Sequence, residues 1–276
     1  MKTILLAMIA ATFATSSFSQ IQKRTDFFAE ALKLQQARTT TLISLKDSSY
    51  NYSAWSKATV TWDFIRRNVY RYNSFYKEDG NLSSSNSSGS GWIYEDNAKN
   101  YVYDVNQRLL QVTLEGWNGS WSDYYKTLYT YDVAGNVLSK TDQVWLSGAW
   151  QNREYSSYTY SGNLRTSALL QYWDATTNSW VNNTRSTFAY TGGQLTSSTD
   201  EDWNATSWTN AMRRTNFVYA GTDLLSYEFE MWDASMGAYV LATKTSFGYD
   251  TNHHMLTSFI DLCNNSTTSW ENFIKT

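Results

Sequence analysis

The feature that most constrains the fold of this chain is an internal repeat of about thirty residues, marked by two interlocked series of aromatic residues. The first series is the tyrosine that closes an aromatic-x-Tyr pair, and its members are Tyr72, Tyr103, Tyr131, Tyr160, Tyr190, Tyr219 and Tyr249. The second series lies 10 or 11 residues earlier, at Trp62, Trp92, Trp121, Trp150, Trp180, Trp208 and Tyr239, and it continues at Trp270. Two series that recur at the same interval predict a protein of about seven repeats of 28–31 residues, each stabilised by its neighbours.

A third series indicates that each repeat is a β-hairpin. A tryptophan precedes the second-series position across a short polar turn, at Trp55, Trp117, Trp145, Trp173, Trp203 and Trp232. Cys263 takes this position in the last repeat, and the repeat around Ser83 to Ser90 lacks it. Short Gly- and Asn-containing turns between aromatic segments are typical of hairpins. The sequence therefore predicts an all-β fold of tandem antiparallel hairpins of about 29–30 residues, forming a long meander in an open twisted sheet or a solenoid-like shell.

Composition agrees with a sheet that runs through most of the chain. Aromatic residues make up 17% of the sequence, and aromatic side chains favour strands. The 276 residues include no proline. Because proline cannot donate a hydrogen bond to a β-ladder, its absence fits a continuous sheet. The net charge of −3, without a basic stripe, argues against a nucleic-acid partner. With a single cysteine the chain forms no internal disulfide, so burial and strand pairing must hold it together.

Alternation along the strands predicts which side chains share a face. An offset of 10 residues between Trp180 and Tyr190 places both on one side of a regular strand. This recurring face carries Trp at one end, Tyr or Phe at the other, and Gln or Glu, Asn and Thr between them, whereas the opposite face differs between repeats. We expect the repeated face to be the interior and the variable face to meet solvent or a partner. Two repeats, Trp92/Tyr103 and Trp208/Tyr219, have an offset of 11, which predicts a β-bulge in each.

The segment Tyr129-Thr130-Tyr131-Asp132-Val133-Ala134-Gly135-Asn136 resembles a YD repeat of the Rhs type, and Tyr103-Asp104 and Tyr249-Asp250 are weaker copies. The Trp-turn-Trp-x-Asn element, as at 173–182, is similar to the Trp-rich YD-like repeats of secreted Bacteroidetes proteins, which are type IX secretion cargo. Ser161, Thr191 and Ala220 depart from the Asp of that motif. The resemblance covers about residues 50–276 and implies a repeat array, exported from the cell, whose last unit is truncated.

The N-terminus predicts export. Met1-Lys2, an apolar run from Ile4 to Ala14 and small residues up to Ser19 have the order of a secretory signal peptide. We therefore divide the chain into a signal peptide (1–19), a leader with a possible short capping helix (20–49) and the repeat array (50–276). The mature protein is expected outside the cell or at the cell surface, with no membrane span after signal cleavage.

No residue pattern predicts catalysis, a cofactor site or a metal site. His253 and His254 lie in a predicted turn, Cys263 fills a Trp position, and alternation separates Glu201 from its two aspartate neighbours. We therefore expect a non-enzymatic structural or interaction protein: a stalk, adhesin or envelope module. The alternative is a carbohydrate-binding module that contacts polysaccharide through aromatics of the variable face, with a cell-surface protein as the other possible partner. The candidate contact residues are Tyr155, Tyr172, Tyr227 and Phe229.

Overall fold

The computed structural model describes residues 48–275, except for 57–60, 75–76, 88–91 and 265–268. The predicted signal peptide and the predicted capping helix lie outside the described residues. Among the described residues, no helix is long and apolar enough to cross a membrane.

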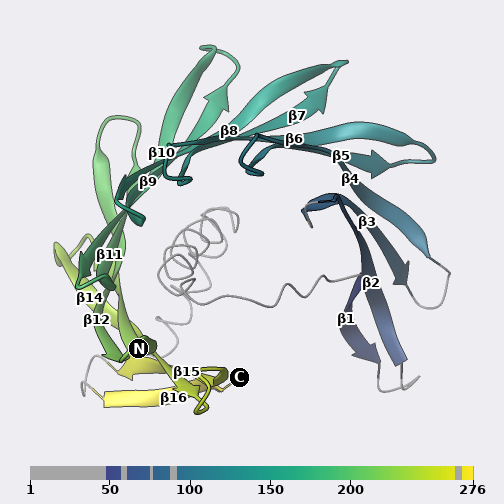
Figure 1. Ribbon diagram of the computed structural model, residues 1–276. Coiled ribbons are helices and arrows are strands. Elements are labelled where there is room, and N and C mark those ends of the chain that lie inside the picture. The colour runs from purple at the N-terminus through teal and green to yellow at the C-terminus, as the bar shows by residue number, and fades with distance from the viewer. Residues whose placement is uncertain (1–47, 57–60, 75–76, 88–91, 265–268, 276) are drawn as a thin grey trace. The chain divides into compact units, whose positions relative to one another are not determined.

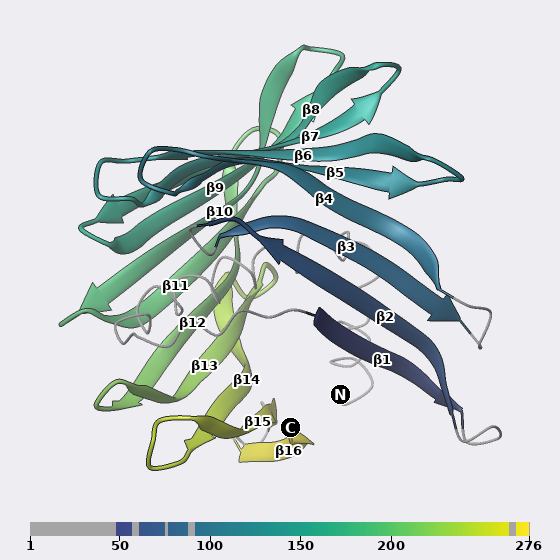
Figure 2. The same ribbon diagram turned by 45° about the vertical axis from the view of Figure 1, so that its right-hand side comes forward.

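Sixteen strands follow one another as antiparallel neighbours in a single open sheet, which confirms the predicted fold class. Figures 1 and 2 show the strands paired in the order of the chain. They form eight hairpins, one more than the seven repeats counted from the tyrosines. The strands are β1 (Ser48–Ser56), β2 (Thr61–Tyr72), β3 (Glu78–Ser87), β4 (Ile93–Tyr103), β5 (Leu109–Trp117), β6 (Trp121–Tyr131), β7 (Val137–Leu146), β8 (Ala149–Ser161), β9 (Leu164–Asp174), β10 (Ser179–Thr191), β11 (Gln194–Trp203), β12 (Trp208–Ala220), β13 (Asp223–Asp233), β14 (Ala238–Tyr249), β15 (Met255–Asn264) and β16 (Ser269–Lys275).

The chain divides into two compact units. The N-terminal unit contains described residues 48–157 together with 171–181, and the C-terminal unit contains 158–170 together with 182–275. Each unit is described below by its own contacts.

A β-bulge in the second strand of the hairpins changes the predicted assignment of faces. In the β7–β8 hairpin, Gln143 lies opposite Asn152 and Asp142 lies opposite Glu154, so β8 has one extra residue, Arg153. The same register shift occurs three residues after the second-series position in β4, β6, β12, β14 and β16. One extra residue exchanges the two faces for the rest of the strand. The second Trp and the closing Tyr of such a repeat therefore lie on opposite faces, here called the tryptophan face and the tyrosine face.

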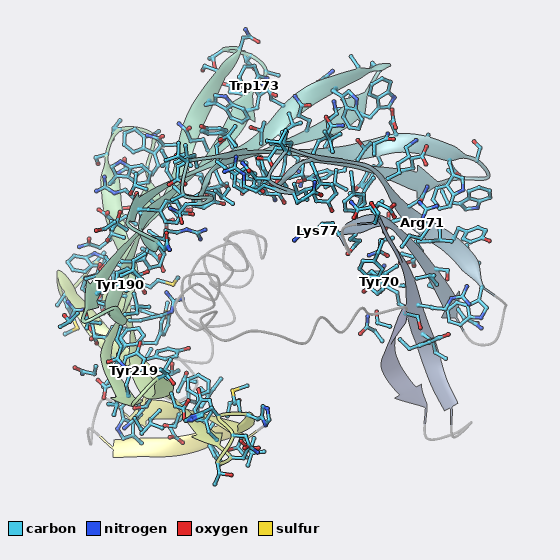
Figure 3. The ribbon with its side chains drawn as sticks, in the orientation of Figure 1. Tyr70, Arg71, Lys77, Trp173, Tyr190 and Tyr219 are labelled. Carbon is cyan, nitrogen blue, oxygen red and sulfur yellow. The ribbon has the colours of Figure 1, made fainter. Side chains whose placement is uncertain are left out.

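The tyrosine face is the more buried one, so the prediction that the variable face meets solvent is wrong. The variable positions Asp142, Leu170, Ser198 and Asp200 are each at most 2% exposed. They share the tyrosine face because of the bulge. In the C-terminal unit the core of this face consists of short and aliphatic side chains at adjacent positions, with Leu195 and Leu224 fully buried. Tyrosines occupy equivalent positions of this unit, as labelled for Tyr190 and Tyr219 in Figure 3.

The two repeats with an offset of 11 contain the additional bulges that the sequence predicts. On β4, Asn100 and Tyr101 together oppose Val112 on β5, and on β12, Asn216 and Phe217 together oppose Tyr227 on β13. Asn100 and Asn216 have φ of 53° and 52° within these segments, a left-handed conformation that asparagine tolerates better than most residues. The second bulge reverses the face again and compensates for the odd offset, so Tyr103 and Tyr219 stay on the tyrosine face.

Candidate interaction surface on the tryptophan face

Pairs of aromatic rings occupy the ends of the hairpins on the tryptophan face. Each third-series tryptophan meets the second-series ring across the hairpin edge to face, with ring centroids 5.0–5.2 Å apart and interplanar angles of 61–72°. This geometry is one that aromatic pairs favour. Figure 3 shows Trp173 near the turn-proximal end of its strand. The pairs are Trp117–Trp121, Trp145–Trp150 and Trp173–Trp180 in the N-terminal unit, and Trp203–Trp208 and Trp232–Tyr239 in the C-terminal unit.

A cation from one repeat lies over the second ring of the next repeat. Lys126 Nζ lies 4.2 Å from the centroid of Trp150, and the Arg185 guanidinium carbon lies 4.7 Å from that of Trp208. Arg213 stands in the same relation to Tyr239, at 4.4 Å. Each of these cations is the fifth residue after the second-series position of its own repeat. The cation–π contact thus joins neighbouring repeats rather than closing one hairpin.

A carboxylate on the intervening strand holds the arginine in place in the C-terminal unit. Arg185 donates from Nε to Glu201 Oε2 at 2.5 Å and from Nη2 to Glu201 Oε1 at 2.8 Å. In the next repeat, Arg213 donates from Nε to Glu230 Oε2 at 2.6 Å. Glu201 and Glu230 each lie two residues before the first Trp of their repeat. A complete repeat therefore supplies a ring and a carboxylate from its first strand, and these flank the cation of the preceding repeat.

The β3–β4 hairpin departs from this pattern. Ser85 lies opposite Ile93, so Asn86 is the β3 residue that faces Trp92, where the other repeats have an indole, except for Cys263 in the last one. Trp92 is 42% exposed and meets Tyr50 at 6.3 Å and the Arg67 guanidinium carbon at 4.8 Å. On the same strand Tyr94 is 46% exposed and reaches Trp117 and Trp121, each at 5.7 Å. An exposed aromatic cluster of the N-terminal unit therefore lies in the repeat that lacks its first Trp.

The four aromatics predicted as ligand contacts do not form one group. Tyr155 lies on the tryptophan face, where its ring meets Trp180 at 5.5 Å and occupies the position of a cation in other repeats. Tyr227 packs between Phe217 and Phe247 on the tyrosine face, with centroids 5.5 and 6.1 Å away. Phe229 lies under Arg214, at 5.6 Å, and Tyr172 lies in the N-terminal unit. All four are partly buried.

The YD motif marks a turn in which the aspartate binds the backbone. Asp132 Oδ1 accepts from the Asn136 amide N–H at 2.8 Å, and its Oδ2 accepts from the Asn136 side chain at 2.8 Å. Asp104 and Asp250 hold Arg108 and His254 in the same way. These hydrogen bonds lower the pKa of all three carboxyl groups below the ordinary value. The Asp is therefore a structural residue of the longer turn.

Where Thr191 and Ala220 replace this aspartate, the turn is shorter and does not need it, whereas Asn73 keeps the longer turn and accepts a hydrogen bond from the Lys77 amide in its place. Thr191 pairs with Gln194 and Ala220 pairs with Asp223, which leaves two residues in each loop. Glycines with positive φ fill these loops, with φ of 59° and 84° at Gly192 and Gly193. The departures from the YD motif at Thr191 and Ala220 are thus changes of turn length.

The closing tyrosine ties its strand to the start of the preceding one. The hydroxyl of Tyr131 donates to the Leu109 carbonyl at 2.8 Å, and that of Tyr219 donates to the Leu195 carbonyl at 2.9 Å. Tyr249 donates to Leu224 at 3.0 Å, and Tyr103 donates to the Glu78 carbonyl. The tyrosine series therefore has a hydrogen-bonding function within the fold in addition to packing.

The titratable residues singled out by the sequence take part in local contacts. His253 Nδ1 lies 2.8 Å from Asp223 Oδ2, and His254 Nδ1 lies 3.0 Å from Asp250 Oδ2, both in turns as predicted. Asp200 is buried against Arg214 at 3.0 Å, on the opposite face from Glu201. Cys263 is buried opposite Trp270. In the described part of the chain, no group of three or more His, Cys, Asp or Glu side chains could hold a metal ion.

Sequence reasoning missed the cation and its ring as a pair. The fifth position after the second-series ring carries Arg67, Lys126, Arg185, Arg213 and Lys244, with Asn97 and Tyr155 in the other two repeats. The basic residues recur at a constant spacing from the second-series ring. Simple alternation, without the bulge, places them on the face opposite to the second-series ring, so their contact with a ring was not predicted.

Comparison with solved structures finds matches of low sequence identity and low TM-score. No family model and no curated protein matches the chain. A porin-like protein from Bacteroides uniformis is 12% identical, over 77% of this chain and 88% of that one, with a TM-score of 0.40. A Bacteroides fragilis protein of unknown function is 14% identical, over 55% and 90%, with a TM-score of 0.30. The Tc holotoxin pore of Photorhabdus luminescens is 14% identical, over 77% of this chain and 13% of that one, with a TM-score of 0.32.

Proposed function

We propose that this chain is an exported, non-catalytic repeat module that works outside the cell or at its surface as a stalk, adhesin or envelope component. The observation that carries the proposal is the tryptophan face, where ring pairs recur at the end of successive hairpins and remain partly exposed. Partly exposed aromatic rings are enriched at sites of recognition, because they bury a large apolar area on contact. The signal-peptide pattern of residues 1–19 supports export.

The repeats are best understood as YD-like units. The hydrogen-bonded aspartate of the Asp104, Asp132 and Asp250 turns gives the motif a structural reason in this chain. Because the same aspartates bind the backbone, they serve the fold rather than a reaction. A repeat array of this kind offers a long surface that a partner can contact at several equivalent points.

Localisation tests the first part of the proposal. An epitope-tagged chain is expressed in a Gram-negative bacterium, both intact and without residues 2–19. We expect the intact chain outside the inner membrane, shortened by the signal peptide, and the deleted chain in the cytoplasm. Retention of the intact chain in the cytoplasm, at full length, would contradict export.

Carbohydrate is the ligand class that the exposed rings favour. Trp92 and Tyr94 are exposed by 42% and 46%, and Tyr94 lies beside Trp117 and Trp121, so that these rings can stack against the apolar face of a sugar. Tyr155, Tyr227 and Phe229 each pack against a neighbouring side chain, so less of each ring is available. A glycan array with Trp92→Ala and Tyr155→Ala proteins separates the two groups. We expect the first substitution, and not the second, to abolish binding.

A further inference from the structure

We propose that the β3–β4 repeat binds a carboxylated pyranose, that is, a uronic acid residue of an acidic polysaccharide. The ligand supplies the carboxylate and the ring that β3 does not contribute to the tryptophan face, and it displaces the neighbouring side chains that leave Ser84 only 1% exposed. This inference rests on the proposed glycan-binding function and names the sugar class and the residues.

The complete repeats define what is missing. In the C-terminal unit, the first strand β11 contributes Glu201, which binds Arg185 of the preceding strand, and Trp203, which packs on Trp208. The next first strand, β13, contributes Glu230 for Arg213 and Trp232 for Tyr239 in the same arrangement. These two repeats thus pair a cation with a carboxylate and a ring with a ring. In the N-terminal unit Lys126 lies over Trp150 but opposite Gln143, without a carboxylate.

On β3 both contributions are absent. The residue opposite Arg67 is Ser84, which stands in the position of Glu201 but has no carboxylate. Asn86 stands in the position of Trp203 and has no ring. The cation and the second ring are nevertheless retained, because Arg67 lies over Trp92 at 4.8 Å. The repeat therefore keeps the cation, Arg67, and the second ring, Trp92, which in a complete repeat contact a carboxylate and a first ring.

Hydrogen-bond accounting points to the same place. The Nε of Arg67 is buried and has no hydrogen-bond partner among the described residues, whereas the Nε atoms of Arg185 and Arg213 donate to glutamates. The Oδ1 of Asn86 is also buried without a partner in that part of the chain. Buried polar groups are usually paired, and an unpaired one carries a cost of about 1–3 kcal/mol. A carboxylate presented to Arg67 and a hydroxyl presented to Asn86 would pair both after small side-chain rotations.

The surrounding rings suit a sugar chain rather than a single small anion. Tyr50 and Trp92 stand on two sides of the short β3 side chains, with centroids 6.3 Å apart. Tyr94 continues the exposed rings toward Trp117 and Trp121. Equivalent positions of successive repeats are two strand spacings apart, roughly 10 Å, which is about the length of a disaccharide in an extended chain. A pyranose offers its C–H face to an indole and its carboxylate to a guanidinium, and a planar guanidinium binds a carboxylate through two hydrogen bonds.

Binding of oligogalacturonate to the mature protein, measured by calorimetry, tests this assignment. The matched neutral ligand is the same oligosaccharide with its carboxyl groups methyl-esterified, which keeps the ring and removes the charge. We expect the acid to bind at least about tenfold more tightly than the ester, a difference of about 1.4 kcal/mol. Equal binding of acid and ester would overturn the carboxylate assignment while leaving glycan binding intact, and binding of neither by the wild-type protein would overturn the whole proposal.

Two substitutions fill the proposed positions from within the chain. Ser84→Glu supplies the carboxylate that Arg67 lacks, and Asn86→Trp supplies the missing ring. Both are expected to leave the circular dichroism spectrum unchanged, to keep or raise the melting temperature, and to weaken oligogalacturonate binding at least about tenfold. Trp92→Ala is expected to abolish binding.

Arg185→Gln and Trp208→Ala provide the matched controls, since they remove the same cation and ring from a complete repeat. They should lower the melting temperature and leave binding unchanged. A Ser84→Glu protein that is folded and binds as well as the wild type would overturn the assignment. So would a loss of binding in the Arg185→Gln protein that equals the loss in Ser84→Glu. Equally tight binding of inorganic phosphate or sulfate in place of the sugar would show a simple anion site and would also contradict the proposal.

Discussion

Arg185 on β10 lies over the ring of Trp208 on β12, with 4.7 Å from the guanidinium carbon to the ring centroid, while Glu201 on β11 binds the same guanidinium. Three strands and two repeats are joined by this one contact. Lys126 over Trp150 and Arg213 over Tyr239 repeat it at equivalent positions. In an array whose units contact only their neighbours, such contacts set how strongly one repeat depends on the next.

The tyrosine hydroxyl bond predicts a measurable loss of stability in Tyr219→Phe. The substitution leaves the Leu195 carbonyl without the donor that now lies 2.9 Å away, while the ring and its packing remain. We expect the free energy of unfolding in urea to fall by about 1 kcal/mol. Tyr155→Phe is the control, because Tyr155 contacts Trp180 through its ring, which phenylalanine retains. No change in Tyr219→Phe, or an equal change in the control, would contradict a structural role for the hydroxyl.

The aspartates of the YD turns predict a loss of stability in acid. The pKa values of Asp104, Asp132 and Asp250 are lowered, mainly because backbone and side-chain N–H groups bind the ionised form. A group whose folded pKa is depressed contributes stability above its unfolded pKa of about 3.9 and loses it as pH falls through the folded value. The wild-type protein should therefore lose stability below pH 4, and Asp132→Ala should lose less over that range. Identical acid titrations of stability for both proteins would count against this account.

The contact between His253 and Asp223 predicts a weaker dependence of stability on pH, with the opposite sign. The hydrogen bond and the charge of Asp223 raise the pKa of His253 above its usual value of 6.5. The contact therefore contributes fully below pH 6.5 and is lost as pH rises through the folded pKa. An NMR titration of His253 should give a pKa above 6.5 that returns to the ordinary range in Asp223→Asn. A wild-type value at or below 6.5 would show that the contact is not formed in solution.

Each additional bulge contains a residue with a left-handed backbone conformation. The free energy of unfolding should therefore depend strongly on the shape of the side chain at that position. Asn216 has φ of 52°, which a β-branched residue adopts only at a cost of about 1–2 kcal/mol. Asn216→Val should lower the free energy of unfolding by that amount, and Asn216→Gly should be tolerated. Deletion of Asn216 converts the offset of 11 into the common offset of 10, so the folded state is expected to persist. Unfolding of the deletion protein would mean that the register is set by something other than the bulge.

The sequence predicted the hairpin repeat and the strand order because both follow from spacing. The additional bulges at Asn100 and Asn216 were also predictable, since an odd offset reverses a face. The bulge at Arg153 and its equivalents was not, because a bulge present in nearly every repeat leaves the spacing constant. Because this bulge changes which residues share a face, the burial of Leu170 and Ser198 and the contact between Lys126 and Trp150 could not be predicted from the spacing.

A double-mutant cycle on Arg185 and Trp208 tests most directly whether neighbouring repeats are coupled through the tryptophan face. The free energy of unfolding in urea is measured for the wild type, Arg185→Met, Trp208→Leu and the double mutant. Because Arg185 is 40% exposed, we expect a coupling energy of about 0.5–1 kcal/mol, so that the double mutant loses less than the sum of the single mutants. Effects that add to within about 0.3 kcal/mol would contradict the account, because they would show that the cation and the ring of adjacent repeats do not stabilise each other.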